Sequence, residues 1–174
     1  MAPSRVLAAV VLSAALAVPA TAGAADRGSG GSRANVPTPL GAAAAAGQRH
    51  WGAVPCKGQI KLLTQRPPVA GIDPGSDAWV TFDSSLGAND LAAPANSYTN
   101  CTITFARRRW PTSASMKEDW DMFCATMTHE LGHLLGHSHD ASPGSLMAPV
   151  FTDYSGVPAI CRATRPVLSG RRGR

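Results

Sequence analysis

The sequence predicts an α+β domain, in which a short twisted β-sheet packs on one long helix and an irregular C-terminal part follows. Three observations lead to this prediction. Short segments with the composition of strands occupy the first half of the region that can fold. Near residue 115 the apolar residues change to a helical period. Four cysteines lie between residues 56 and 161, an even number that predicts a domain stapled by disulfides.

The two ends of the chain are expected to lie outside this domain. Residues 1–24 are typical of a signal peptide, with Arg5 before the apolar run Val6–Val18, which is too short to span a bilayer. Export and secretion are therefore expected, without stable insertion into a membrane after cleavage.

Two further segments are also too poor in large apolar residues to form a core. Residues 25–50 consist mainly of Gly, Ala, Ser and Pro and are interpreted as a flexible linker or a short propeptide. Residues 162–174 are interpreted as a basic disordered tail. Residues 51–161 remain as the folded domain, a size that fits one domain of a 174-residue chain.

The charge of the chain depends on its ends. The whole chain has a formal net charge of +5 and a pI near 9.4. Residues 51–161, however, contain seven basic and ten acidic residues, a net charge of −3. The basic residues in excess lie near the two termini. A nucleic-acid module built on overall basicity is therefore not expected.

Three strands are expected, at Gln59–Gln65, Ala78–Asp83 and Tyr98–Phe105. The segments between them are rich in Pro, Gly, Ser and Asp and are interpreted as loops. A single helix of about five turns is expected from Ser115 to Leu135, with Gly136 ending it in a left-handed conformation.

The start of this helix fits a capping box, Ser115-x-x-Glu118. No regular element is expected after Gly136. In an exported chain four cysteines indicate two disulfides, and three pairings are open. We favour Cys56–Cys101 and Cys124–Cys161 among them.

The helix carries the motif His129-Glu130-Leu131-Gly132-His133. Residues i and i+4 share one face, so the two imidazoles can bind one ion. Three nitrogen ligands with an open fourth position suit a catalytic zinc ion. Glu130, next to the first ligand, is the candidate general base and later acid.

The third ligand is expected to be a histidine that follows the helix. In a continued helix His137 would lie about 12 Å from His129 along the axis, too far to share one ion with it. A turn at Gly136 instead favours His139 as the ligand. His137 is then expected to be a solvent-facing neighbour, and Asp140 to make a local hydrogen bond.

The pattern His129-Glu130-x-x-His133-x-x-Gly136-x-x-His139 resembles the zinc signature of the metzincin metallopeptidases. Met147, eight residues past His139, is similar to the methionine of their Met-turn. The short spacing and the following residues are most similar to the matrixin branch.

The resemblance implies a zincin-like fold and roles for further residues. Met147 would form the base of the site, and Pro149, Val150 and Phe151 would form the outer wall of the main specificity pocket. Tyr98–Phe105 would be the edge strand that pairs with extended substrate. Family members also carry about five strands and an additional helix before the active-site helix, of which we find three strands and no such helix.

These observations predict a secreted zinc-dependent endopeptidase with one catalytic zinc ion and a protein or peptide substrate. A structural calcium ion is compatible with the resemblance but not indicated, and we expect a monomer. The alternative is a weak or inactive zinc-containing binding or adhesion module of the same fold. A purely structural zinc ion would require a fourth protein ligand, for which His137 and Asp140 are the candidates.

Overall fold

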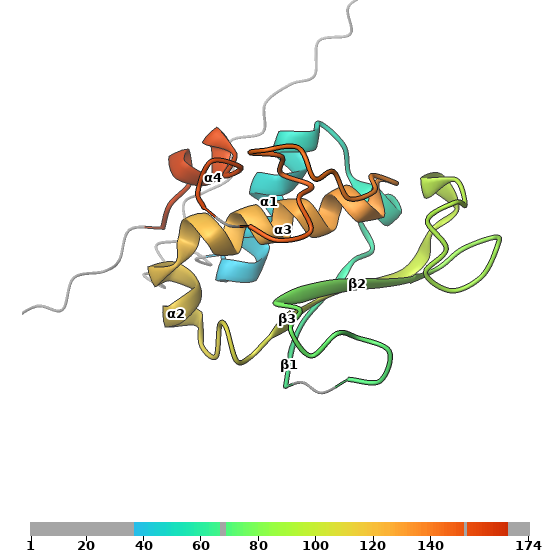
Figure 1. Cartoon of the computed structure of the whole chain (residues 1–174), viewed down its shortest axis with the longest axis horizontal. Coiled ribbons are helices and arrows are strands. Elements are labelled where there is room, and N and C mark those ends of the chain that lie inside the picture. Colours follow the sequence, from blue (N-terminus) through green and yellow to red (C-terminus); the bar gives the residue numbers. More distant parts are fainter. Residues whose placement is uncertain (1–36, 67–68, 152, 167–174) are drawn as a thin grey trace, which may run out of the picture. The chain divides into compact units, whose positions relative to one another are not determined.

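The computed structural model describes residues 37–66, 69–151 and 153–166 (Figure 1). These residues form a small mixed domain with a three-stranded sheet, one long helix and two disulfides, which confirms the α+β prediction. The elements are, in chain order, α1 (Pro39–Trp51), the 3-10 turn η1 (Pro55–Gly58), β1 (Lys61–Gln65), β2 (Ala78–Asp83), the 3-10 turn η2 (Ala95–Ser97), β3 (Thr99–Ala106), α2 (Ser113–Glu118), α3 (Trp120–Leu134) and α4 (Ala159–Ala163).

The sheet has the strand order β1-β3-β2, so β3 is its central strand. It runs parallel to β1, with Leu63 opposite Thr104, and antiparallel to β2, with Val80 opposite Ile103. The expectation that Tyr98–Phe105 forms the substrate-pairing edge strand is therefore wrong, because β3 has a partner on both sides. Among the described residues β2 pairs only with β3, apart from one isolated bridge between Asp83 and Ala88.

The structure places a helix, α1, inside the segment interpreted as a flexible linker, so that interpretation is wrong for residues 39–50. The Thr38 side chain accepts a hydrogen bond from the N–H of Gly41, and Pro39 occupies the first helical turn. Alanine has the highest helix propensity, which makes the run Ala42–Ala46 helical. Gly52, with φ of 63°, ends the helix.

α1 buries small side chains against α3. Ala43 and Ala46 are fully buried, and a Cβ on Gly47 would lie 2.6 Å from Cδ1 of Leu131. The two helices can approach closely because these residues are small. The domain therefore begins at or before residue 39 rather than at residue 51.

The expected single helix is in fact two helices, α2 and α3, separated at Asp119. Thr112 rather than Ser115 is the N-cap of α2, and the hydroxyl of Ser115 completes the capping box from the third helical position. Asp119 breaks the helix with ψ of 37° and accepts hydrogen bonds from Arg109 and from the indole of Trp110. Beyond α3, Gly136 adopts φ of 89°, as expected.

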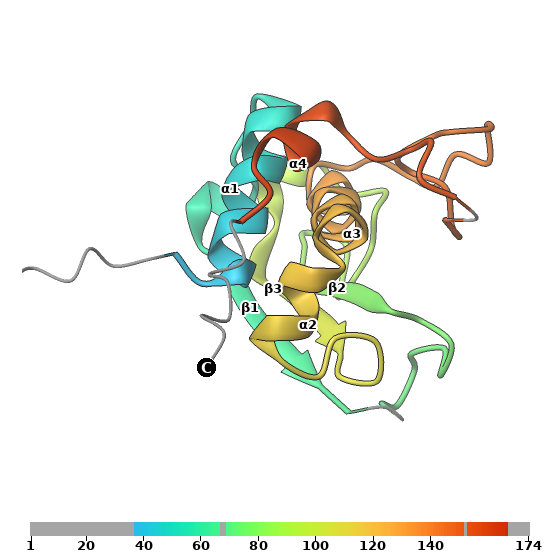
Figure 2. The ribbon, with the colours of Figure 1, turned by 90° about the vertical axis from the view of Figure 1, so that its left-hand side faces the viewer.

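The core surrounds α3. The helix contacts α1, α4 and the strands β2 and β3, so residues on all its faces are buried. Figure 2, which views α3 nearly end-on, shows α1 and α4 beside it and the strands below. Phe105, Trp110 and Phe123 form an aromatic cluster between the sheet and α3.

Both favoured disulfide pairings are confirmed, Cys56–Cys101 and Cys124–Cys161. The second joins α3 to α4, a short helix in a part of the chain where no regular element was expected. Part of the segment interpreted as a disordered tail is also ordered. Arg162 lies in α4 and donates to the carbonyl of Tyr154, and Arg165 pairs with Asp121.

The proposed signal peptide at 1–24, residues 25–36 and residues 167–174 lie outside the described part of the chain. Within the described part, none of the helices combines the length and the apolar character needed to cross a membrane.

Candidate metal and active site

Three histidine side chains converge at the C-terminal end of α3. The Nε2 atom of His133 lies 3.0 Å from Nε2 of His129 and 3.2 Å from Nε2 of His139. The candidate ligand atoms of the three residues all lie within 4.8 Å of one another. The helix supplies the first two, one turn apart, and the turn at Gly136 brings back the third. These are the histidines that the sequence analysis selected as ligands.

Two backbone carbonyls fix the orientation of the helical histidines. Nδ1 of His129 lies 2.8 Å from the carbonyl oxygen of Leu146, and Nδ1 of His133 lies 2.8 Å from that of His137. A carbonyl oxygen can only accept, so each Nδ1 carries the proton and each Nε2 presents a lone pair. Such outer partners are typical of metal-binding histidines.

The ionisation of these histidines also suits a cation. Burial lowers the pKa of His129 to about 4, and burial likewise lowers the pKa of His133, so both imidazoles are neutral at pH 7. Two neutral nitrogens that face each other with lone pairs repel unless a cation lies between them. Tetrahedral zinc with bonds of about 2 Å separates its nitrogen ligands by about 3.3 Å, close to the observed spacing. The residues present therefore fit a zinc ion.

Glu130 lies beside the histidine cluster and is only 5% exposed. It lines the same cleft as His129 and His133. Burial raises the pKa of its carboxyl group to about 8. A carboxyl group with a pKa near neutrality can both take up and release a proton at physiological pH, which is the requirement for a general base that later acts as an acid.

Met147 lies against α3 between the two helical histidines. A Cβ on Gly132 would lie only 2.6 Å from Sδ of Met147. The Met147 N–H bonds to the hydroxyl of Ser145, and its carbonyl accepts from the N–H of Asp140. The methionine is therefore held from both neighbouring turns, and it is 6% exposed.

A cleft of about 730 Å³ opens beside the histidines. Its walls come from β2 and the loop before it, from α3, and from the segment after Met147. Pro149, Val150 and Phe151 all line it, and the ring of Phe151 meets that of His129 edge-on at 5.7 Å. Val150 is 71% exposed, which places its side chain at the open surface of the cleft.

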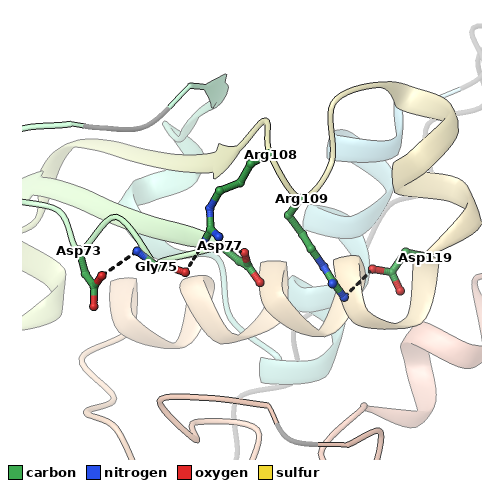
Figure 3. A network of polar contacts seen from close by, with 6 residues as sticks. All are labelled: Asp73, Gly75, Asp77, Arg108, Arg109 and Asp119. Atoms are coloured by element: carbon green, nitrogen blue, oxygen red, sulfur yellow. Dashed lines mark hydrogen bonds and ion pairs between the residues drawn. The ribbon is translucent and has the colours of Figure 1, made fainter.

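Figure 3 shows two arginine side chains that contact acidic residues, in a network that includes the cleft residues Gly75 and Asp77. Arg108 bonds to the carbonyl of Gly75 and pairs with Asp77 at 3.0 Å. Arg109 pairs with Asp119 at 3.1 Å, and its side chain lines the cleft. Residues 107–109 form an exposed turn, in which Arg108 contacts cleft residues and Arg109 itself lines the cleft.

Several cleft residues were missed by sequence reasoning. Thr126 and Met122 lie three and seven residues before His129, so they share its helical face, and this spacing could have identified them. Trp79, a residue of β2, also lines the cleft. The carbonyls of Leu146 and His137 could not have been found, because a backbone group has no residue-specific signal.

His137, Asp140 and Tyr154 lie away from the centre of the site. The His137 ring is exposed and stacks on Trp51, as expected of a solvent-facing neighbour. Asp140 accepts hydrogen bonds from the backbone and hydroxyl of Ser142, as expected. Tyr154 is 56% exposed and lies at the surface. Among the described residues the metal-capable group therefore has three members and no fourth protein ligand.

The part of the chain that carries the site is similar to known proteins. Residues 74–159, which include the cleft and all three histidines, match the family model for matrixins. The chain is 32% identical to the 72 kDa type IV collagenase of Gallus gallus over an alignment of 93 residues, which covers 41% of this chain. The aligned part spans only 14% of the length of that relative. No solved structure matches the chain at a significant level.

The candidate metal site and the cleft thus lie in a part of the chain that is similar to matrixins. The chain is matrixin-like, which confirms the resemblance seen in the sequence.

Proposed function

We propose that this protein is a secreted zinc-dependent endopeptidase. His129, His133 and His139 hold one zinc ion, and Glu130 is the catalytic base. One observation carries the proposal: three imidazoles bring their Nε2 atoms together beside a buried carboxyl group in an open cleft. The set of three ligands leaves a fourth position open, as catalytic zinc sites require and structural sites do not.

The residues divide the chemistry of peptide hydrolysis among them. When bound, zinc supplies Lewis acidity, which polarises a carbonyl oxygen and lowers the pKa of water. Glu130 takes a proton from the attacking water as its oxygen bonds to the carbonyl carbon of the substrate. Glu130 then gives that proton to the amide nitrogen, and the C–N bond breaks to release an amine and a carboxylic acid.

The substrate chain would lie in the cleft in an extended conformation. The outer edge of β2 borders the cleft and can pair with a peptide main chain, in place of the strand first expected to do so. Pro149, Val150 and Phe151 form the outer wall of the main specificity pocket. Met147 forms the base of the site, in the role of a Met-turn methionine.

Secretion is part of the proposal. Two disulfides and no free cysteine among the described residues suit an oxidising compartment. The apolar segment within residues 1–24 supports export.

The test compares the wild type with Glu130→Gln, which keeps the shape of the side chain and removes the base. Zinc content and cleavage of an unfolded protein such as casein are measured for both. We expect both proteins to hold one zinc ion and the variant to cleave at least about 100-fold more slowly. Glu118→Gln, at an exposed acid at the end of α2, is the matched control and should cleave at the wild-type rate.

A wild type that holds one zinc ion and yet cleaves no faster than Glu130→Gln would contradict the peptidase assignment. It would favour the binding module of the same fold. Several substrates are needed, because the depth of the specificity pocket determines which peptides can enter.

A further inference from the structure

Trp51 links the zinc-binding part of α3 to a segment that lies far from it in the sequence. It is the last residue of α1, and its indole Nε1 donates a 2.8 Å hydrogen bond to the carbonyl of Thr128. Thr128 directly precedes His129. This bond therefore fixes the indole to the turn of α3 from which the first histidine projects.

The same indole contacts the turn that follows α3. Its ring stacks on the ring of His137, with centroids 4.4 Å apart and an angle of 19° between the planes. The carbonyl of His137 is the group that accepts the Nδ1 proton of His133. His139, two residues further on, comes from the same turn. Stacking on Trp51 thus restrains the backbone that orients one histidine and delivers another.

A third contact lies between these two. A Cβ on Gly132 would lie 2.9 Å from Cζ2 of Trp51 and 2.6 Å from Sδ of Met147. In the helical turn between His129 and His133, Gly132 therefore packs against both the indole of Trp51 and the thioether of Met147. Only a glycine leaves room for both.

We infer that Trp51 is a positioning residue for the histidine cluster, and that α1 is therefore part of the zinc site. The inference rests on the proposed function, since it assigns Trp51 a role toward the same zinc ion. In the described part of the chain, Trp51 makes neither a hydrogen bond nor a ring contact with the three ligand side chains. It acts through the carbonyl of Thr128, the ring of His137 and the backbone of Gly132.

The stack on His137 distinguishes this role from ordinary packing. His137 is an exposed residue at the surface, so the loss of its ring leaves no cavity in the core. Removal of that ring should cost little stability of the fold. If the turn needs the stack to hold its shape, however, the loss should weaken metal binding.

The test measures zinc affinity by competition with a chelator in the full chain, and the visible absorption spectrum of the cobalt-substituted protein. Trp51→Leu removes both the stack and the indole donor, Trp51→Phe removes the donor alone, and His137→Ala removes the stacking partner but keeps its carbonyl. Outer partners of metal ligands typically contribute about 10- to 100-fold in affinity. We expect Trp51→Leu to lose about tenfold or more, the other two to lose less, and the cobalt spectrum to shift in all three.

His50→Ala is the matched control. His50 meets Trp51 edge-on at 5.0 Å from the same helix, and it has no contact with the turn after α3 in the part of the chain that the structure describes. Its zinc affinity should stay within about twofold of the wild type. If Trp51→Leu does not fold, Trp51→Phe and His137→Ala decide the question, because both leave an aromatic ring between α1 and α3.

Zinc affinities within twofold of the wild type in all variants, with unchanged cobalt spectra, would overturn the inference and leave the proposed function intact. A wild type that binds no zinc would overturn both.

Discussion

Glu130 combines a buried position with a group that is charged in water. Its side chain lines the same cleft as the imidazoles of His129 and His133, and burial raises its pKa to about 8. In the unfolded chain the same carboxyl group has a pKa near 4.5. The metal-free folded protein therefore keeps a proton on Glu130 at a pH where the unfolded chain has lost it.

This difference predicts that the metal-free wild type loses stability, relative to a variant that cannot ionise at this position, as the pH rises from 6.5 to 8. Over this range Glu130 holds more of its proton in the folded state than in the unfolded state, so the loss in the free energy of unfolding should be about 1 kcal/mol per pH unit. Folding lowers the pKa of His129 and His133, so these groups make both proteins less stable as the pH falls through about 6.5, and their contribution cancels in the comparison. Urea denaturation of the chelator-treated protein at several pH values measures the loss.

Glu130→Gln provides the comparison, since it cannot ionise. Between pH 6.5 and 8 the free energy of unfolding of the wild type should fall by about 1.5 kcal/mol relative to that of the variant. Parallel curves for the two proteins would show that Glu130 is not the group responsible.

The three histidine ligands could be predicted from the sequence, but the groups that orient them could not. The rise of a helix and the turn at Gly136 are enough to select His139 over His137. The groups that orient the ligands are the carbonyls of Leu146 and His137, and any residue has a carbonyl. Trp51 was beyond prediction for another reason, because it lies 77 residues before its hydrogen-bond partner Thr128.

Among the helices and strands, α1 is the one for which amino-acid composition led to a wrong expectation. A segment without large apolar residues was expected to gain too little from burial to become ordered. α1 is instead stabilised by van der Waals contacts, because Ala43, Ala46 and Gly47 let its backbone lie directly against α3. Composition identified the strands because each strand carries its own apolar and β-branched residues, whereas the packing value of small residues depends on the partner surface. The break at Asp119 was missed for the same reason, since it depends on Arg109 and Trp110 from another segment.

This close contact predicts that Gly47→Leu destabilises the protein. A Cβ at this position would lie 2.6 Å from Cδ1 of Leu131 and 3.2 Å from Cα of Thr128, so α1 must move away from α3. Overpacking of this kind costs about 1–3 kcal/mol. Chemical denaturation measures the loss, and zinc affinity should fall with it, because Trp51 moves with α1.

Ala45→Leu is the control within the same helix. Ala45 is partly exposed and lies well around the helix from Gly47, so its substitution should change the free energy of unfolding by less than about 0.5 kcal/mol. Equal losses for the two variants would mean that the α1–α3 contact is not as close as the structure has it.

At the scale of the whole molecule, α3 is the element that unites the domain. It contacts α1, α2, α4 and two strands, and a disulfide ties it to α4. The histidines lie at its C-terminal end, where the turn at Gly136 and the segment around Met147 also meet. A ligand bound there stabilises parts of the chain from α1 to residue 147 at once. Zinc binding and the unfolding of the entire domain should therefore be coupled.

This coupling predicts a large thermal shift with zinc. A ligand that binds only the folded state at about 100 times its dissociation constant adds about 2.7 kcal/mol. For a domain of this size that corresponds to a rise of about 10 °C in the melting temperature, in a single transition. Scanning calorimetry of the chelator-treated protein, with and without added zinc, measures the shift. His139→Ala should lose most of it while keeping the melting temperature of the metal-free protein, because this side chain is exposed. A shift of equal size in His139→Ala would place the bound zinc somewhere other than the three histidines.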